Sequence, residues 1–186
     1  MEALFGGSFD PVHMGHLIVA EAAADALDVC IRFVVAREQP FKGRTHHASP
    51  EQRADMVAAA IAGNPRFRVE RIELELPPPS YTVRTLRALA QREPGNRFLL
   101  LIGGDAAQDL PGWHEVEALP GLADVVALSR PGFTPPATTL IGRTVTVPTI
   151  DISATAVRDR VAAGRSIRYL VPEAVRDYIA AHGLYR

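Results

Sequence analysis

The sequence has little cysteine, little excess charge and no long apolar run. Cys30 is the only cysteine in 186 residues, so no disulfide can form within the chain. Basic and acidic side chains number 20 and 21, and the formal net charge of -1 offers no overall basic field for nucleic acid. No apolar stretch approaches the ~20 residues that a membrane-spanning helix needs. These absences argue against nucleic-acid and membrane partners.

The first residues also lack the basic and then apolar pattern of a signal peptide. With a single cysteine, this favours a soluble protein of the cytoplasm. The length suits one domain, which we expect to span residues 1–186. Nothing in the sequence fixes the oligomeric state, so a homo-oligomer stays open.

A glycine-rich turn, residues 6–16, is the most informative stretch of the chain. It follows the apolar residues 3–5 and precedes an amphipathic segment at 17–27, which predicts a strand, a turn and a helix start. Glycine lets a ligand approach the backbone, and the unpaired amides of a helix start attract phosphate. With His13 and His16 at this helix start, the turn predicts a nucleotide site. Two alternatives to a nucleotide site remain: the histidines form a metal site with Asp10, or they are purely structural.

Strand and helix patterns alternate along the chain, which is typical of a parallel sheet. The most apolar run, residues 98–102, is expected at the sheet centre, and residues 67–76 alternate like a half-exposed edge strand. Ser49, Pro50 and Gln52 form the pattern of a capped helix start. The expected fold is α/β and Rossmann-like: a doubly wound, mostly parallel sheet with helices on both faces and a small C-terminal helical part. Further strands are expected at residues 30–36, 124–128 and 144–147.

Candidate ligand-binding residues follow the expected strands, where open α/β sheets bind ligands. Glycine at position 103 permits close approach, and the Asp105 carboxylate can accept ribose hydroxyls, unless it only caps a helix. Trp113 lies in a loop and is either a core residue or a stacking platform. Ser80 or Thr82 can cap a helix. The candidate cations at strand ends are Lys42 and Arg130.

A second phosphate site is predicted near the C-terminus, in the segment Ile152-Ser153-Ala154-Thr155-Ala156-Val157-Arg158. Ser153 or Thr155 can cap the helix that follows, and Arg158 lies one turn into it. A helix start with two hydroxyls and an arginine suits phosphate. Neither the metal reading nor the structural reading of the histidines predicts such a partner.

These segments together resemble a known family. Gly-x-Phe-x-Pro-x-His-x-Gly-His, at residues 7–16, resembles the signature of the HxGH nucleotidyltransferase superfamily. The longer stretch Gly-Gly-Ser-Phe-Asp-Pro-Val-His-Met-Gly-His-Leu resembles the bacterial nicotinate-nucleotide adenylyltransferases. The Ser-Tyr-Thr segment at 80–82, the Ile-Gly-x-Asp segment at 102–105, the Ile-Ser-x-Thr-x-x-Arg segment at 152–158 and the C-terminal 166–185 resemble the same family, so the likeness covers the whole chain.

The resemblance implies adenylyl transfer from ATP to nicotinate mononucleotide, giving deamido-NAD and pyrophosphate. Mg²⁺ would accompany ATP, held mainly by phosphate oxygens and water, and no dedicated metal site is expected. The implied catalytic residues are His13, His16, Lys42 and Arg158, and bound phosphates would keep one histidine cationic. The implied ATP-binding residues are Gly6, Gly7, Ser8, Phe9, His13, His16, Gly103, Asp105, Ile152, Ser153, Thr155 and Arg158. The implied mononucleotide-binding residues are Gly7, Ser8, Lys42, Tyr81, Thr82, Trp113 and Arg130.

The chain departs from the family at two positions. Phe41 stands where a histidine is common, and His114 follows Trp113 where a second aromatic is common. Three rival interpretations remain. In the first, the reaction is the same but the acceptor is nicotinamide mononucleotide or another phosphate. In the others, the chain is a nucleotide-binding protein without turnover or a metal-dependent hydrolase.

Overall fold

The computed structural model describes residues 1–39, 46–130, 132, 136 and 138–186. Within these residues the strands form one six-stranded sheet in the order β3-β2-β1-β4-β5-β6, and every pair is parallel. The strands are β1 (Glu2–Gly7), β2 (Cys30–Val35), β3 (Phe67–Glu70), β4 (Phe98–Gly103), β5 (Ala123–Ser129) and β6 (Arg143–Thr146). The expected sheet, with residues 98–102 near its centre, is therefore confirmed.

Most of the helices follow the sequence patterns. They are α1 (Met14–Leu27), α2 (Pro50–Ile61), α3 (Ile72–Glu75), α4 (Thr82–Arg92), α5 (Gly104–Asp109), α6 (Leu119–Leu122), α7 (Ala154–Ala162) and α8 (Glu173–Ala181), with short 3₁₀ turns at Leu110–Gly112 and Val116–Ala118. At α2 the Ser49 hydroxyl accepts from the Gln52 amide, and the Gln52 side chain accepts from the Ser49 amide, as the capping pattern predicts.

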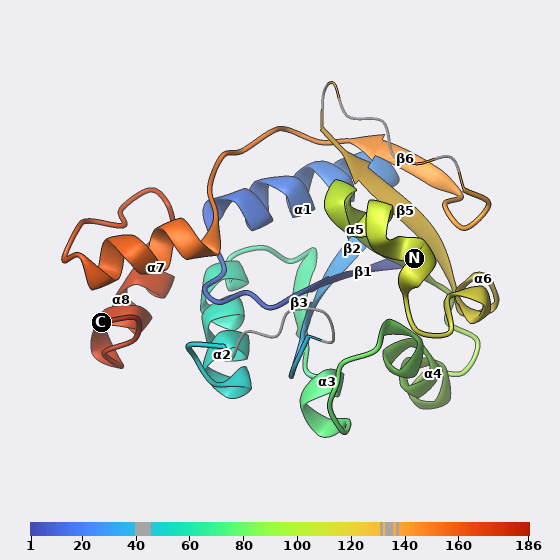
Figure 1. Ribbon diagram of the computed structural model, residues 1–186, viewed down its shortest axis with the longest axis horizontal. Coiled ribbons are helices and arrows are strands. Elements are labelled where there is room, and N and C mark those ends of the chain that lie inside the picture. The colour runs from blue at the N-terminus through green and yellow to red at the C-terminus, as the bar shows by residue number, and fades with distance from the viewer. Residues whose placement is uncertain (40–45, 131, 133–135, 137) are drawn as a thin grey trace.

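Helices cover both faces of the sheet (Figure 1). Because side chains alternate along a strand, β4 sends Leu99 and Leu101 to one face and Leu100 and Ile102 to the other. The first face packs against α1, α2, α7 and α8, and the second against α3, α4, α5 and α6. Burial on both faces explains why β4 is almost continuously apolar. The helices α7 and α8 form the C-terminal helical part at one side of the sheet (Figure 1).

The expected strand at 67–76 is only half correct. The strand β3 ends at Glu70 and does lie at the sheet edge, but α3 follows over Ile72–Glu75. Glu73 points inward, and its carboxylate accepts from the Thr85 hydroxyl of α4 at 2.7 Å. Packing on α4 therefore overrides the alternating pattern. Among the described residues, no helix is long and apolar enough to cross a membrane.

Candidate active site

The candidate site lies at the carboxyl ends of β1 and β4, the two central strands. The chain leaves β1 toward β2 on one side, while β4 lies on the other, which makes this the point where open α/β sheets bind ligands. Phe5 pairs with Leu101, which brings the glycine-rich turn after β1 next to Gly103. At both Gly6 and Gly103 a side chain would meet nothing within 4 Å. These glycines therefore leave open space above the sheet.

The two histidines form a stacked pair at the start of α1. His13 is the N-cap residue, and its ring centroid lies 3.7 Å from that of His16, with the ring planes inclined by 24°. The ring of Phe9 meets His16 edge-on at 5.0 Å. A Cβ atom at position 15 would lie 3.1 Å from the His13 ring, so any larger residue there would press on that ring.

One hydrogen bond fixes the proton position on His16. Its Nδ1 accepts from the His13 backbone amide at 3.2 Å, so in the neutral ring the proton sits on Nε2, which is left as a donor. The Nδ1 atom of His13 is buried and has no hydrogen-bond partner among the described residues. The Nε2–H of His16 is therefore the donor that this pair offers to a ligand.

Both histidines are neutral in the ligand-free protein at pH 7. Burial lowers the pKa of His13 to about 4. Burial and the adjacent His13 ring lower the pKa of His16 to about 3. The expectation of a cationic histidine therefore requires bound phosphate to raise one of these pKa values, because the protein alone favours neutral rings.

Asp10 is the centre of a network that sequence reasoning considered only as a metal ligand. Its buried carboxylate accepts from the amides of His47 and Ala48, at 2.9 and 3.2 Å, and from the Tyr185 hydroxyl at 2.8 Å. The loop before α2 and the C-terminal Tyr185 are thereby tied to the histidine turn. These bonds occupy the carboxylate, which weakens the metal-site alternative. Among the described residues, no three His, Cys, Asp or Glu side chains are grouped to hold a metal.

The start of α7 meets the histidine turn, as the two-site prediction requires. Arg158 donates to the Asp10 backbone carbonyl at 2.7 Å and to the Thr155 hydroxyl at 3.1 Å. Ser153 is the N-cap of α7, and its hydroxyl accepts from the Ala156 amide at 3.1 Å. The structure thus brings together the two predicted phosphate sites. Asp10 and Arg158, which are in contact, are 148 residues apart in the sequence.

Arg53 is a buried residue that the sequence interpretation missed. Its guanidinium donates to the carbonyls of Ser8 and Ala36, both at 2.7 Å, and to those of Arg37 and Ala48. By contrast, the buried Arg32 is paired with carboxylates, including Glu93. The charge of Arg53 is therefore shared among carbonyls behind the glycine turn. The sequence did contain a signal for its burial: Arg53 lies one turn before Val57, on the apolar face of α2.

Aromatic side chains gather at the start of α4. Tyr81 is the N-cap residue, and its ring stacks on His114, with centroids 4.2 Å apart. Arg84 lies over the Tyr81 ring at 4.9 Å. Trp113 is half-buried and packs against the apolar cluster on this face. His114, which departs from the family pattern, thus serves as an aromatic partner of Tyr81.

Three helix-capping alternatives, for Ser80, Thr82 and Asp105, are wrong. The Ser80 hydroxyl accepts from the amides of Arg37 and Glu38, so it fastens the loop after β2 and does not cap α4. Thr82 is the first residue of α4 and not its cap. The N-cap of α5 is Gly103, and Asp105 lies exposed in the first turn of that helix.

The remaining predicted residues are more scattered. Arg130 is exposed beyond the end of β5, and Ile152 is half-buried before α7. Lys42 and Phe41 lie outside the described residues, as do Pro131 and residues 133–135. The Ser8 hydroxyl lies 3.5 Å from the side chain of Gln39, the last described residue before position 46.

Comparisons with known proteins identify the family of this chain. A family model described as cytidylyltransferase-like matches residues 4–160. A relative from Thermus thermophilus, named "probable nicotinate-nucleotide adenylyltransferase", is 45% identical over 98% of both chains. A relative of the same name from Geobacillus thermodenitrificans is 44% identical over 98% of this chain and 84% of its own.

A solved structure supports the fold. Plasmodium falciparum nicotinic acid mononucleotide adenylyltransferase complexed with NaAD superposes with a TM-score of 0.77 over 99% of this chain and 96% of that chain, at 20% identity. At that identity the likeness concerns the fold alone. On the family model and the curated relatives, this chain belongs to the cytidylyltransferase-like family and, within it, to the nicotinate-nucleotide adenylyltransferases.

Proposed function

We propose that the starts of α1 and α7 form one phosphate clamp, and that the chain uses it to transfer AMP from ATP to nicotinate mononucleotide. The 5′-phosphate oxygen of the mononucleotide attacks the α-phosphorus of ATP. The bond from that phosphorus to the bridging oxygen breaks, and pyrophosphate leaves with the electron pair. The products are deamido-NAD and pyrophosphate.

The observation that carries this proposal is the contact between the two helix starts. The stacked His13 and His16 lie at one, and Arg158 reaches from the other to the Asp10 carbonyl at 2.7 Å. Helix starts present free amides and partial positive charge. A triphosphate between them would meet donors from both sides.

The reaction requires positioning and charge stabilisation more than a protein nucleophile. The attacking phosphate oxygen is already anionic, so the main task of the protein is to align it and to stabilise the developing charge. His13 and His16 would donate to the α-phosphate and the bridging oxygen. The fixed tautomer of His16 supports this role, because its Nε2–H is a donor without prior protonation.

The leaving pyrophosphate would be held by residues of the α7 start. Ser153, Thr155 and Arg158 would contact the β- and γ-phosphates, together with Lys42 from the segment outside the described residues. Mg²⁺ would enter with ATP, bound by phosphate oxygens and water. The donor set fits this, because the described residues near the clamp are mainly cations, hydroxyls and amides, and Asp10 is fully engaged.

The nucleoside ends would lie to either side of the clamp. The Gly6, Gly7 and Ser8 backbone would contact both nucleotides, with Phe9 beneath, while Gly103, Asp105 and Ile152 would hold the adenosine. Tyr81, Thr82 and Trp113 would form the pyridine site, where Tyr81 and His114 already stack. Arg130 would supply a further cation on the mononucleotide side.

The direct test is pyrophosphate release from the purified full chain mixed with ATP, Mg²⁺ and nicotinate mononucleotide. We expect multiple turnovers and a nicotinate-adenine dinucleotide product. ATP binding without pyrophosphate would favour the non-catalytic alternative. Zinc retained after purification, with hydrolysis in the absence of the mononucleotide, would favour the hydrolase alternative.

The acceptor is tested by comparing kcat/KM for nicotinate and nicotinamide mononucleotides. A nicotinate carboxylate needs donors or a cation, whereas a carboxamide also needs an acceptor. We expect a higher kcat/KM for the nicotinate form, and a preference for the nicotinamide form would contradict this acceptor.

Because the reaction consumes ATP, we also propose that the protein works in the cytoplasm. Its oligomeric state is measured on the same sample by light scattering.

A further inference from the structure

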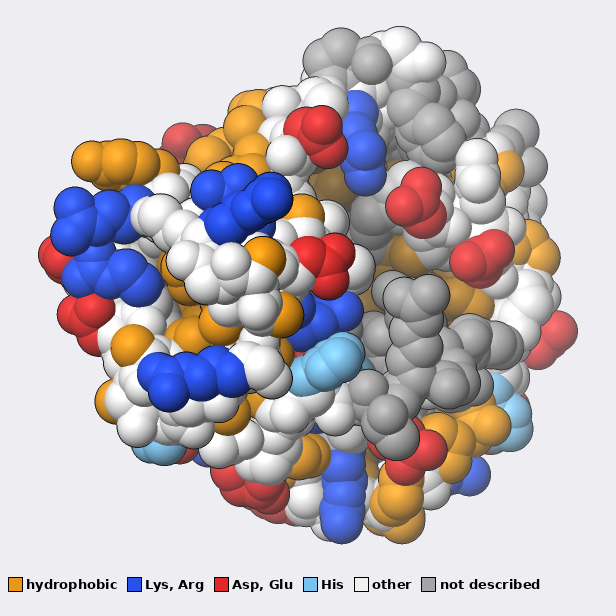
Figure 2. Space-filling view, turned by 60° about the vertical axis from the view of Figure 1, so that its left-hand side comes forward, with side chains coloured by type: hydrophobic (Ala, Val, Ile, Leu, Met, Phe, Trp, Pro, Cys, Tyr) orange, Lys and Arg blue, Asp and Glu red, His pale blue; other side chains and the backbone are white. Residues whose placement is uncertain are grey.

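A second, arginine-lined pocket lies between the end of α7, the segment after it, and α8. Its volume is about 300 Å³. Arg165, Arg168, Arg176 and Arg186 line it around an apolar floor, and no carboxylate side chain is among its lining residues. In Figure 2, arginine side chains (blue) gather on the side of the molecule that carries α7 and α8.

Among the described residues, three of the four arginines of this pocket have no carboxylate partner, whereas the fourth, Arg176, is paired with Glu173 and Asp177. Arg71, Arg87 and Arg97 are each paired with a carboxylate. Within the described residues, by contrast, Arg165 and Arg168 have no side-chain ion pair or hydrogen bond, and Arg186 reaches only the Ala180 carbonyl at 3.4 Å. Unpaired guanidinium groups around one pocket suit an anion, because the planar fork matches phosphate and carboxylate oxygens.

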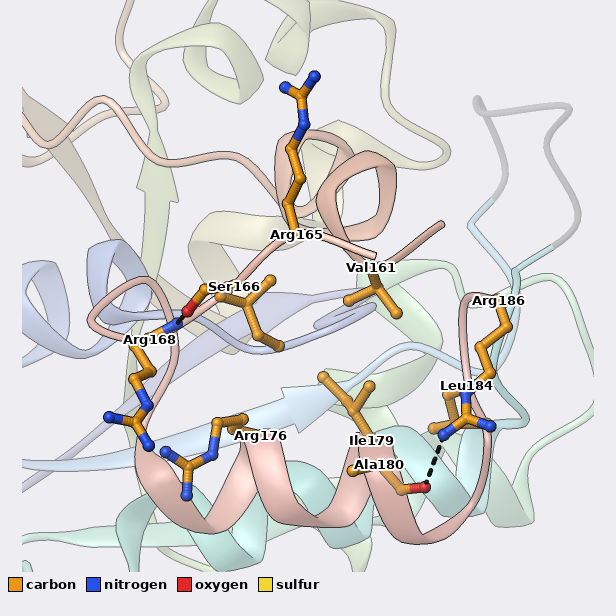
Figure 3. A pocket seen from close by; sticks show the side chains of 10 residues that line it. Val161, Arg165, Ser166, Arg168, Arg176, Ile179, Ala180, Leu184 and Arg186 are labelled. Atoms are coloured by element: carbon orange, nitrogen blue, oxygen red, sulfur yellow. Dashed lines mark hydrogen bonds between the residues drawn. The ribbon is translucent and has the colours of Figure 1, made fainter. Parts of the chain in front are cut away.

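The arrangement of the pocket adds a second requirement on the ligand. Arg168 and Arg176 point to the same end of the pocket, and Arg186 lies toward the other end (Figure 3). The side chains of Val161 and Ile179 lie between these ends, and Leu184 lies at the Arg186 end. A ligand that fills the pocket therefore needs an anionic group at the Arg168 end and an apolar body over the floor.

The same segments that build the pocket also hold the active site. Val161 lies on α7, one turn beyond Arg158. Leu170, two residues after Arg168, accepts from the Met14 amide at 2.8 Å, in the first turn of α1. Leu184 and Arg186 flank Tyr185, whose hydroxyl donates to Asp10. A ligand in the pocket would thus contact three segments that fix the positions of the histidine turn and of Arg158.

We propose that this pocket binds a small organic anion, with a phosphate or carboxylate head and an apolar body, and that its occupancy is coupled to ATP binding at the active site. Anion binding to the pocket does not depend on the proposed function. The coupling does rest on the proposed function, because it requires ATP to bind beside Arg158. Coupling of this kind is reciprocal: each ligand changes the affinity for the other by the same factor.

The binding test uses hexyl phosphate, hexanoate and hexanol, titrated by calorimetry into the full chain saturated with ATP and Mg²⁺, so that the active site is occupied. We expect saturable binding of one or both anions and at least ~10-fold weaker binding of hexanol. Comparing the two anions shows which head group is preferred. Equal binding of hexanol, or no saturable binding of either anion, would overturn the proposal.

Variants locate the site. Arg168→Gln should weaken anion binding by ~10-fold, and Ala180→Trp should abolish it by filling the pocket. Arg143→Gln, an exposed arginine on β6 outside the pocket, is the matched control and should bind like the wild type. Equal losses in all three variants, or none in Arg168→Gln, would refute the assigned site.

Coupling is measured as the Kd of ATP with and without saturating anion. We expect a change of ~5-fold or more in the wild type, and none in Ala180→Trp. An unchanged Kd in the wild type, with the anion bound, would refute the coupling and leave the proposed reaction untouched.

Discussion

The phosphate side of the candidate site, Asp10, His13, His16 and Arg158, is tied together by side chains from distant parts of the chain. Asp10 alone accepts hydrogen bonds from two amides and from Tyr185. The pyridine side, Tyr81, Trp113 and His114, is held mainly by ring stacking and apolar packing.

The roles proposed for the two sides account for this difference. Charge stabilisation works best when donors are fixed before the substrate arrives, since no free energy is then spent on reorienting them. Recognition of a flat ring tolerates small movements, because stacking depends weakly on position. We therefore expect substitutions on the phosphate side to affect stability and kcat, and substitutions on the pyridine side to affect KM.

The largest effect should come from Arg53→Met, behind the phosphate side. Removing the guanidinium leaves buried carbonyls of Ser8, Ala36 and Ala48 without donors, and each can cost ~1–3 kcal/mol. We expect the free energy of unfolding, from urea titration, to fall by about 4 kcal/mol. Arg87→Met, on the surface, should change the free energy of unfolding far less. Equal losses would show that Arg53 contributes no more than a surface arginine.

His16→Ala tests the chemistry of the phosphate side. Loss of a donor to the reacting phosphate should lower kcat by ~100-fold, about 2.7 kcal/mol, with a small change in KM for ATP. The matched control is His182→Ala, an exposed histidine stacked on Tyr178 of α8. A His16→Ala enzyme that turned over at the wild-type rate would rule out the role assigned to this residue.

The buried neutral histidines predict a pH dependence of stability. Their folded pKa values, about 4 and about 3, lie below the ordinary value of 6.5, so the unfolded chain binds more protons between these limits. Stability should therefore be full above pH 6.5 and fall as the pH drops toward 4, by up to ~1.4 kcal/mol per pH unit for each histidine. Urea titrations from pH 7 to 4.5, on the wild type and on His13→Gln/His16→Gln, measure this slope. An equal slope in the double variant would assign it to other groups.

Trp113→Ala tests the pyridine side. Losing the indole should raise KM for nicotinate mononucleotide by ~10-fold, about 1.4 kcal/mol, while kcat at saturation changes less than ~3-fold. Trp113→Phe should recover most of the affinity. If kcat fell and KM did not, the two sides of the site would not differ in the way proposed here.

Tyr185→Phe should give the smallest effect. It removes one hydroxyl that donates to Asp10 at 2.8 Å, worth about 1 kcal/mol, and should lower kcat and the free energy of unfolding together. Tyr178→Phe, whose hydroxyl lies 3.4 Å from the Asp55 carboxylate at the surface, is the control and should change neither. A fall in stability alone would limit Tyr185 to a structural role.

Local patterns in the sequence determined much of this protein. The apolar runs predicted the parallel sheet and its centre, and the glycine turn and the Ser153 segment predicted the two helix starts. Such features depend on residues close in sequence, through backbone freedom, capping and periodicity. The strand predicted at 67–76 failed in its second half because the side chain of Glu73 packs against α4.

Only the tertiary structure decided the rest. The contacts of Asp10 with Arg158 and Tyr185 join residues 148 and 175 positions apart. The neutrality of the histidines comes from their burial, and the burial of Arg53 from three backbone segments that meet around it. Burial and long-range hydrogen bonds are properties of the packed chain, so no pattern of neighbouring residues contains them.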